Sequence, residues 1–518
     1  MPPIAINAFA LGCYFTAMIM VGIYHVWQIV SSDEYLIGSW RVSFWEIVGT
    51  TLATWAGASV FFGFVGMGFE TGLNGFFYWV VPGCLFTIIF VHLYGRALRR
   101  LQLYTMADVF AVRFGKKAAL LPALIHILVY SIPTLALQFI GFGISLQVFF
   151  GMELQQGIVI SFFAISLYTL MGGLPTTILT DCIQAVLIII ASVLMLVFGI
   201  HYAGGIGRII EITPTNFWYP FGSGGPMSFL KTALTIGPFY MVWQVTWQRI
   251  YAARDEKTAV SGVIWGFILA LLVGLNSFLT GICARGYIPH DTLPDFVTAT
   301  AIANVFPPVV GALVVVGLAS AVMSSADSFT MMGSSSIARD IYQQYYRPGA
   351  SDREMLIVSR WSVALMSVLA LIFALKGWAI IPMYSMVVET CGAGLVFPVL
   401  GLLLWRRTTR AGVTASMLSG SLVTVLWHLA GSPWIFEAVP GYITSLVVLV
   451  GVSLCTRHAP DEQVKAAYFE ELDVTGYNQH FKDAQRLAGK SPWLFRARDR
   501  AARRTFASES SLDSSSKD

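Results

Sequence analysis

The stretch Gly317-Leu-Ala-Ser-Ala-Val-Met-Ser-Ser-Ala-Asp-Ser-Phe-Thr330 places several hydroxyl groups and one carboxylate inside an apolar run of membrane-crossing length. Unpaired polar groups are costly in hydrocarbon, so these side chains are expected to face protein, a cavity or an ion. In a helix, Ser324, Asp327 and Ser328 lie at positions i, i+3 and i+4 and share one face. This face is predicted to form part of a cation site.

The composition of the whole chain agrees with a membrane location. Of its 518 residues, 56% are hydrophobic and 12% are charged, and the mean hydropathy is +0.70. Soluble domains carry about 25% charged residues. The sequence therefore predicts an all-α polytopic membrane protein.

Apolar runs of about 18 residues or more mark helices that can cross the bilayer. About 13 transmembrane helices are expected on this basis, and two of the runs exceed one crossing. The predicted spans are 5–30, 43–70, 73–95, 118–150, 155–172, 178–203, 228–250, 259–284, 299–340, 356–376, 379–405, 411–430 and 438–456.

The positive charges predict the orientation of these spans. One set of alternate loops holds 17 Lys and Arg residues and the opposite set holds 4, and cytoplasmic loops are normally the positive ones. The N-terminus is therefore expected outside and the C-terminus in the cytoplasm. The segment Met1–Val30 lacks a basic start and a cleavage site, so we interpret it as a retained transmembrane helix and not a signal peptide.

Two of the predicted spans contain cues for a broken helix. Span 43–70 carries Ala53-Thr-Trp-Ala-Gly-Ala-Ser59, and span 228–250 carries Gly237-Pro238. Interrupted helices in the two halves of a transporter indicate a binding site near the middle of the membrane. Close packing of helices is the alternative explanation for the glycines.

Several motifs, taken in order, resemble one known family. They are Leu167-Tyr-Thr-Leu-Met-Gly-Gly-Leu-Pro175, Thr180-Asp-Cys-Ile-Gln184, Gln248-Arg249 with Ala252-Ala253-Arg254-Asp255, and Ala321-Val-Met-Ser-Ser325 with Arg339-Asp340-Ile-Tyr342. Over roughly 35–405 the chain resembles the sodium/solute symporters. The resemblance implies a LeuT-like 5+5 inverted repeat with one extra helix before it and two after it.

The family's architecture implies a division of the chain into six parts. These are a leading helix and loop (1–42), a first inverted repeat (43–203), an extracellular loop (204–227), a second inverted repeat (228–405), two additional transmembrane helices (406–456) and a cytoplasmic tail (457–518). The tail is charged and serine-rich and is expected to be partly disordered. Its basic run Arg496–Arg504 either holds anionic lipid headgroups or is simply solvated.

The resemblance also implies a sodium site between the first and eighth core helices. Its oxygens come from backbone carbonyls and hydroxyls, and neutral oxygens suit a hard monovalent cation. The matching positions are Ala53, Ala56, Ala321, Ser324 and Ser325.

The resemblance also implies a possible second cation site, because some members of the family have a second sodium site. Asp181 fits one of its roles, and Ser324, Asp327 and Ser328 fit the other. The chain departs from the usual pattern because Asp327 stands where a serine is usual. The two carboxylates could hold a second cation, or one could stay protonated, so one and two Na⁺ per solute both remain open.

The broken spans offer an aromatic lining for a solute. Ala53-Thr-Trp55, Gly237–Arg249 and Ser324-Ser-Ala-Asp-Ser328 are most similar to the choline-transporter branch, in which tryptophans matching Trp55 and Trp243 help to cage a quaternary ammonium. The helix at 118–150 offers no tryptophan for a third wall. Proline, another amino acid or a small monocarboxylate are the alternatives. The predicted substrate-binding residues are Trp55, Phe62, Tyr240, Trp243 and Trp247.

The sequence thus predicts Na⁺-coupled uptake of a small organic solute by alternating access. The expected partners are Na⁺, the solute and the lipid bilayer, with no nucleic acid, and the bacterial inner membrane is the favoured location. No Ser/His/Asp arrangement, metal constellation or phosphate loop predicts an enzyme. A transporter-like sensor that signals through the tail is the less favoured rival. The intramembrane acid Glu389 either takes part in function or pairs with a neighbouring helix.

Overall fold

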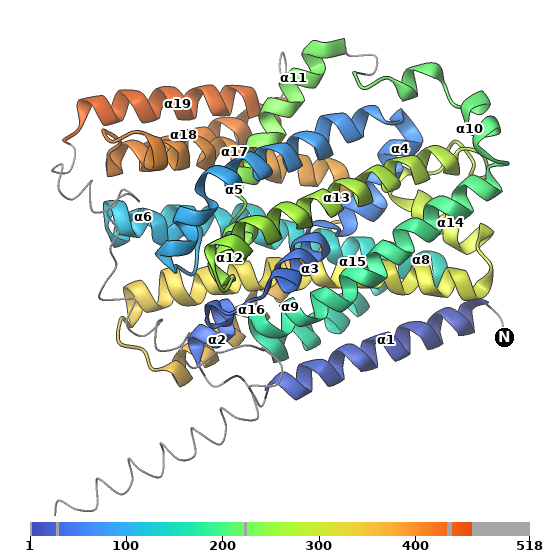
Figure 1. The fold of residues 1–518 in the computed structure, drawn as a ribbon, viewed down its shortest axis with the longest axis horizontal. Helices are drawn as coiled ribbons and strands as arrows, with labels where there is room; N and C mark the ends of the chain where they lie inside the picture. Colours follow the sequence, from blue (N-terminus) through green and yellow to red (C-terminus); the bar gives the residue numbers. More distant parts are fainter. Residues whose placement is uncertain (1–2, 27–28, 30, 222–224, 432–437, 458–518) are drawn as a thin grey trace, which may run out of the picture. The chain divides into compact units, whose positions relative to one another are not determined.

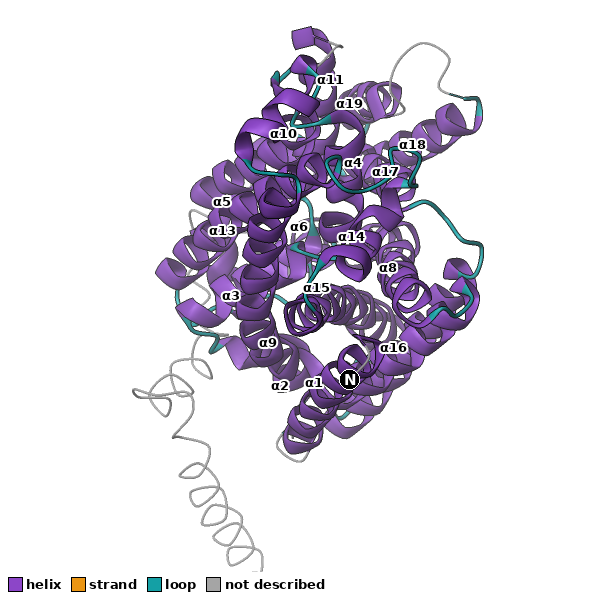
Figure 2. Cartoon of the chain, turned by 90° about the vertical axis from the view of Figure 1, so that its right-hand side faces the viewer, coloured by secondary structure: helices purple, strands orange, loops and turns teal. Residues whose placement is uncertain are grey.

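The computed structural model describes residues 3–26, 29, 31–221, 225–431 and 438–457. All of them lie within Met1–Val464, the first of the two units into which the chain divides. The described residues are overwhelmingly helical and form no strand beyond one isolated bridge between Val42 and Ala253. Figure 1 and Figure 2 show long helices packed side by side, which confirms the all-α class. The predicted tail lies outside the described residues except for Arg457.

The helices follow one another with short connections. They are α1 (Pro3–Val26), α2 (Ser32–Ile37), η1 (Gly38–Trp40), α3 (Phe44–Trp55), η2 (Ser59–Phe64), α4 (Val65–Thr71), η3 (Phe76–Val80), α5 (Val81–Leu101), α6 (Met106–Phe114), η4 (Lys116–Ala118), α7 (Leu120–Leu124), η5 (Ile125–Ser131), α8 (Ile132–Phe150), α9 (Leu154–Tyr202), α10 (Ile206–Ile212), η6 (Thr215–Trp218), α11 (Gly225–Ile236), η7 (Gly237–Met241), α12 (Gln244–Ala252), α13 (Glu256–Ala284), η8 (Pro294–Phe296), α14 (Val297–Val305), α15 (Pro308–Ser335), η9 (Ser336–Tyr346), α16 (Asp352–Ala374), α17 (Ile380–Leu404), α18 (Arg410–Leu429) and α19 (Ala438–Cys455).

Ten helices among the described residues are long and apolar enough to cross a membrane, or eleven if a bent pair is counted as one span. The predicted count of thirteen is therefore not confirmed, although helices occupy every predicted range. The shortfall has a local cause in each case. The helix at Leu154–Leu170 is short, and the segment 228–250 is divided among α11, η7 and α12.

Both predicted helix breaks are present. Helix α3 ends at Trp55, and Ala56 leaves helical geometry with φ −84° and ψ 48°. The chain then resumes in η2, and the two parts of this span are bent by 56°. In the other span the break falls after η7, where Trp243 is extended with ψ 105°.

Helix α9 joins two predicted spans, 155–172 and 178–203, through a bend. Gly173 has φ +61°, a backbone conformation that residues other than glycine rarely adopt, and Pro175 lies two positions further along. A Cβ at Gly173 would also lie 2.6 Å from the Tyr35 ring. The glycine therefore allows both the turn of the chain and the close approach of α2.

Helix α15, which carries the stretch quoted first, lies at the centre of the described residues. It packs against α9, α8, α1, α16 and α3, and most of its residues are buried. Small residues allow the close packing: a Cβ at Gly317 would lie 2.2 Å from the Cβ of Ala191 on α9. The hydroxyl-rich face of α15 is thus held against neighbouring protein and away from lipid.

Candidate functional site

The break in α3 leaves two backbone carbonyls without their usual helical donors. Gly57 N–H donates to Trp55 O at 3.0 Å, and Ala58 N–H donates to Gln138 Oε1 at 2.9 Å. In a continuous helix these two N–H groups would serve Ala53 and Thr54. The carbonyl oxygens of Ala53 and Thr54 are therefore available to another partner.

Helix α15 supplies that partner through two adjacent serines. Ser324 Oγ lies 2.9 Å from Ala53 O and 2.8 Å from Ser320 O of its own helix, and Ser325 Oγ donates to Thr54 O at 2.8 Å. Ser324 Oγ also lies 3.1 Å from Ala321 O. Both serine side chains are fully buried. The structure thus brings together four of the five residues predicted for the sodium site.

The fifth predicted residue, Ala56, lies at the point where the helix ends. Its N–H donates to Leu52 O at 3.0 Å as the last helical bond of α3, and the residue is buried. The next residue, Gly57, has no room for a side chain, because a Cβ there would lie 2.5 Å from Ser325 Oγ and 2.9 Å from Gln138 Oε1. The surrounding oxygens are neutral, which suits a hard monovalent cation.

A second polar cluster lies next to the first. Arg249 on α12 donates through Nη2 to Ser328 Oγ at 2.5 Å, Thr54 Oγ1 at 2.9 Å and Thr50 Oγ1 at 3.0 Å. Thr50 Oγ1 in turn donates to Asp181 Oδ2 at 2.6 Å. Two of the residues predicted for a second cation site, Asp181 and Ser328, therefore belong to one cluster.

Asp327 has a different partner. Its Oδ1 accepts a hydrogen bond from the Thr169 hydroxyl of α9, and its Oδ2 has no hydrogen-bond partner among the described residues. It is fully buried, as is Asp181. The two carboxylates are thus engaged by different hydroxyls, Thr169 and Thr50.

A small cavity lies beside the serines. Its volume is about 10 Å³, roughly the least that can hold one water molecule, so it would have to widen to hold the expected solute. Its wall combines aromatic rings with hydroxyl and amide groups and contains no charged side chain. The lining residues are Thr54, Trp55, Gly57, Ser59, Thr134, Gln138, Trp243, Ser325, Phe329 and Tyr384.

Two of the five predicted substrate-binding residues, Trp55 and Trp243, line the cavity. The indole N–H of Trp243 is buried and has no hydrogen-bond partner among the described residues. Tyr240 lies behind the wall, with its hydroxyl 2.8 Å from that of Tyr384. Trp247 packs on Phe90 with ring centroids 5.4 Å apart.

Phe62, the remaining predicted residue, is fully buried and does not line the cavity. Sequence reasoning missed Phe329 and Tyr384, which supply two further aromatic walls from α15 and α17. Phe329 directly follows Ser328, a predicted site residue, so its place in the sequence could have identified it. No predicted site residue lies next to Tyr384 in the sequence. Arg249 was identified as part of a family motif but was not predicted to lie in the site, although an arginine inside a predicted span is itself a signal of function.

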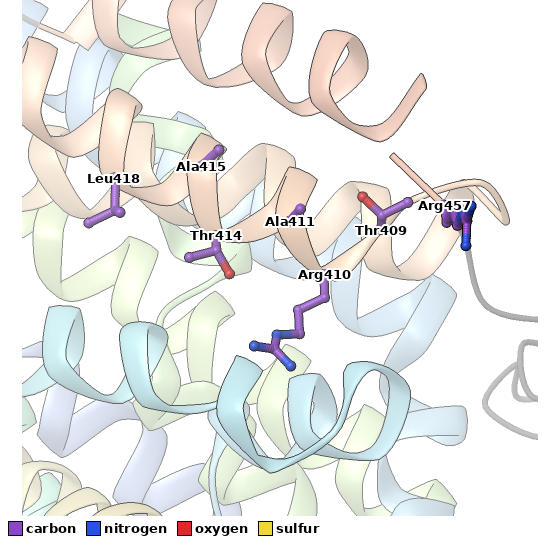
Figure 3. A pocket seen from close by; sticks show the side chains of 7 residues that line it. All are labelled: Thr409, Arg410, Ala411, Thr414, Ala415, Leu418 and Arg457. Carbon is purple, nitrogen blue, oxygen red and sulfur yellow. The ribbon is translucent and has the colours of Figure 1, made fainter. Parts of the chain in front are cut away.

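Other features lie apart from these clusters. A groove of about 590 Å³ runs along α18 and contains none of the predicted site residues. Figure 3 shows the side chains that line it, which are Thr409, Arg410, Ala411, Thr414, Ala415, Leu418 and Arg457. Glu389 is buried in α17.

Comparison with known proteins identifies relatives over most of the chain. The osmoregulated proline transporter OpuE of Bacillus subtilis (strain 168) is 26% identical, over 89% of this chain and 96% of the relative. The high-affinity proline transporter PutP of the same organism is 27% identical, over 88% and 99%. The sodium/pantothenate symporter of Haemophilus influenzae is 25% identical, over 83% and 92%.

Solved structures show the same fold. A substrate-bound, outward-open Na⁺-coupled sialic acid symporter matches with a TM-score of 0.74 and 20% identity, over 88% of this chain and 99% of that chain. Mhp1, a nucleobase-cation-symport-1 family transporter in a closed conformation, matches with a TM-score of 0.60 and 12% identity, over 85% and 99%. These likenesses establish a LeuT-like fold.

The family model for the sodium:solute symporters matches residues 35–420. This match covers about three quarters of the chain and contains both helix breaks and the whole of α15. The chain therefore belongs to the sodium:solute symporter family, whose members couple solute transport to Na⁺.

Proposed function

We propose that Na⁺ binds between the broken end of α3 and the centre of α15, held by oxygens of Ala53, Ala56, Ala321, Ser324 and Ser325. The observation that carries this proposal is the pair of serine hydroxyls at 2.8–2.9 Å from the carbonyls that the break exposes. When Na⁺ binds, the two hydroxyl protons turn away and the serine oxygens face the ion. Na⁺ then adds a bridge between two helices that already pack together and share hydrogen bonds.

The coupling follows from this position. Ser325 belongs to the proposed sodium site and also lines the cavity for the solute, and it bonds the carbonyl oxygen of Thr54, another lining residue. Occupation of one site would therefore organise the wall of the other. Separation of α3 and α15 on the cytoplasmic side would pull the ion's ligands apart. Na⁺ and the solute would therefore leave together, and the inward Na⁺ gradient would drive uptake by alternating access.

One solute class that suits the cavity wall is a small quaternary ammonium compound, choline-like or betaine-like. Four aromatic side chains, Trp55, Trp243, Phe329 and Tyr384, surround the space, and no charged side chain lines it. Ring faces attract such a cation by about 2 kcal/mol or more when water is excluded. A carboxylate elsewhere in the solute is not required for this interaction.

Proline is the second candidate, and two observations favour it. Relatives that cover nearly the whole chain are named as proline transporters. The unpartnered indole N–H of Trp243 could donate to a carboxylate, which choline lacks. The sodium/pantothenate relative extends the range to other carboxylates.

The excess of positive charge on alternate loops supports a cytoplasmic C-terminus and an external N-terminus. The relatives described above come from bacteria, which supports the bacterial plasma membrane as the location.

The test of this proposal is the melting temperature of the purified protein with choline, glycine betaine, proline and pantothenate, each in Na⁺ and in K⁺. A ligand at a hundred times its Kd adds about 2.7 kcal/mol to the folded state. Stabilisation by choline or betaine only in Na⁺ supports both the ion site and the aromatic cage. Stabilisation by proline alone would agree with Na⁺-coupled symport but would reject the proposed aromatic cage for a quaternary ammonium compound.

A further inference from the structure

The guanidinium group of Arg249 lies where α12 meets α3 and α15. A single nitrogen, Nη2, is within 3.0 Å of hydroxyl oxygens on Thr50, Thr54 and Ser328. Thr54 and Ser328 also bond each other, with their oxygens 2.7 Å apart. Three helices are thus joined around one positively charged nitrogen.

Asp181 on α9 supplies the matching negative charge. Its Oδ2 lies 3.7 Å from Arg249 Nη2, and the Thr50 hydroxyl connects the two groups. The side chains are 1% and 0% exposed, so bulk water does not screen them. Arginine does not lose its proton in proteins, which makes this positive charge permanent.

These oxygens form the kind of site that a small cation would otherwise use. A carboxylate with neighbouring hydroxyls is a suitable ligand set for Na⁺. Here, however, three of the hydroxyls already contact the guanidinium group. An ion at the same place would lose those oxygens and would lie beside a like charge in a medium of low dielectric constant.

We propose that Arg249 acts as a built-in cation at the predicted second site, so that the transporter carries one Na⁺ with each solute. This inference rests on the proposed sodium site at Ser324 and Ser325 and sets the number of ions that the protein moves. The positive charge needed to compensate Asp181 stays with the protein throughout the cycle. Asp327 is not hydrogen-bonded to Arg249 among the described residues; its Oδ1 accepts a hydrogen bond from the Thr169 hydroxyl.

The experiment is a count of radioactive Na⁺ ions bound at saturation per purified chain, with choline and, separately, proline present. The wild-type protein is expected to bind one Na⁺ with a Hill coefficient near one. Arg249→Gln, which removes the charge, should bind two, because Asp181 and the released hydroxyls become available. Arg249→Lys keeps the charge and should stay at one.

A double variant tests the location of the additional ion. Arg249→Gln combined with Asp181→Asn should return to one Na⁺, because the carboxylate that attracts the second ion is gone. Two ions bound to the wild-type protein would overturn the inference, even if the arginine variants fail to fold. Loss of one of those ions in Asp327→Asn would then assign the second site to Asp327.

The outcome also separates this inference from the proposal on which it rests. No Na⁺ bound to the wild-type protein would reject the sodium site at Ser324 and Ser325. Two bound ions would leave that site standing and reject only the role of Arg249. A folded Arg249→Gln variant that still binds one ion would also contradict the inference.

Discussion

The carbonyl oxygen of Thr54 lies 2.8 Å from the hydroxyl of Ser325, and this contact joins the broken end of α3 to the centre of α15. The side chain of the same threonine is bonded to Ser328, one turn further along α15. One residue therefore touches both polar clusters. A change in either cluster is expected to be transmitted to the other through Thr54.

Ser324→Ala and Ser325→Ala should each raise the Na⁺ concentration needed for half-maximal solute uptake. A hydrogen-bonding or coordinating group on a charged partner is worth about 1.5–3 kcal/mol, so we expect about a tenfold effect or more for each variant. Uptake into proteoliposomes at varied Na⁺ measures this. Ser359→Ala is the matched control, because that buried hydroxyl bonds only its own helix at Met355 O. An unchanged Na⁺ requirement in both variants would reject the site.

Gly57→Ala should impair Na⁺ and solute binding together. The new methyl group would lie 2.5 Å from Ser325 Oγ and 2.9 Å from Gln138 Oε1, so it would displace groups that border both sites. Overpacking of this kind costs about 1–3 kcal/mol. Gly451→Ala on α19 is the control, because nothing lies within 4 Å of a Cβ there. Ligand-induced shifts in melting temperature measure the effect, and wild-type shifts in Gly57→Ala would contradict the described geometry.

Substitutions at Trp243 should discriminate between the two candidate solutes. Trp243→Ala removes a ring face worth about 2 kcal/mol and should weaken choline binding about thirtyfold. Trp243→Phe keeps a ring but removes the indole N–H, so it should weaken proline binding more than choline binding. Isothermal titration of both variants with both solutes in Na⁺ measures this. Equal losses of both solutes in Trp243→Phe would show that the N–H does not discriminate between them.

Asp295 should give the protein a pH-dependent stability. Its Oδ2 accepts the Ile380 N–H at 3.0 Å and so caps the start of α17 from η8. Burial raises the pKa of the Asp295 carboxyl, and the Ile380 N–H partly offsets the rise. The stabilisation that a raised pKa brings is complete below the ordinary value of about 3.9 and is lost as the pH rises through the folded-state pKa.

The wild-type protein should therefore gain stability relative to Asp295→Asn as the pH falls towards that range. Asparagine keeps the helix cap without titrating, whereas Asp295→Ala, which has neither cap nor charge, should be about 0.5–2 kcal/mol less stable than Asp295→Asn at every pH. Melting curves of the three proteins from neutral to mildly acidic pH make the comparison. A pH-independent difference between the wild-type protein and Asp295→Asn would contradict the assignment.

The sequence predicted the parts of this fold that depend on local chemistry. Apolar length located the helices, and the Ala53–Ser59 and Gly237-Pro238 stretches located both breaks because small residues and proline interrupt helical hydrogen bonding. Ser324 and Ser325 could be placed beside Ala53 because the family motif supplied the pairing of the two helices. The helix count exceeded the observed one where a break or a bend divides a span.

The sequence did not predict what depends on packing between distant elements. Arg249 lies one residue before the end of the predicted span 228–250, yet its side chain is 1% exposed and points into the protein. Its partner Asp181 is 68 positions away in a different helix, and no local pattern reports such a pair. Tyr384 likewise reaches the cavity only because α17 lies against η2 and η7.

The most direct test of the account is the uptake of radiolabelled choline and of proline into proteoliposomes that contain the purified protein. An inward Na⁺ gradient is imposed, and K⁺ replaces Na⁺ in the control. The account predicts transient accumulation of one of the two solutes with Na⁺, none with K⁺, and a sharply reduced response to Na⁺ when Ser324 and Ser325 are both alanine. Accumulation that is the same in K⁺, or that survives unchanged in the double variant, would contradict a Na⁺ site between α3 and α15.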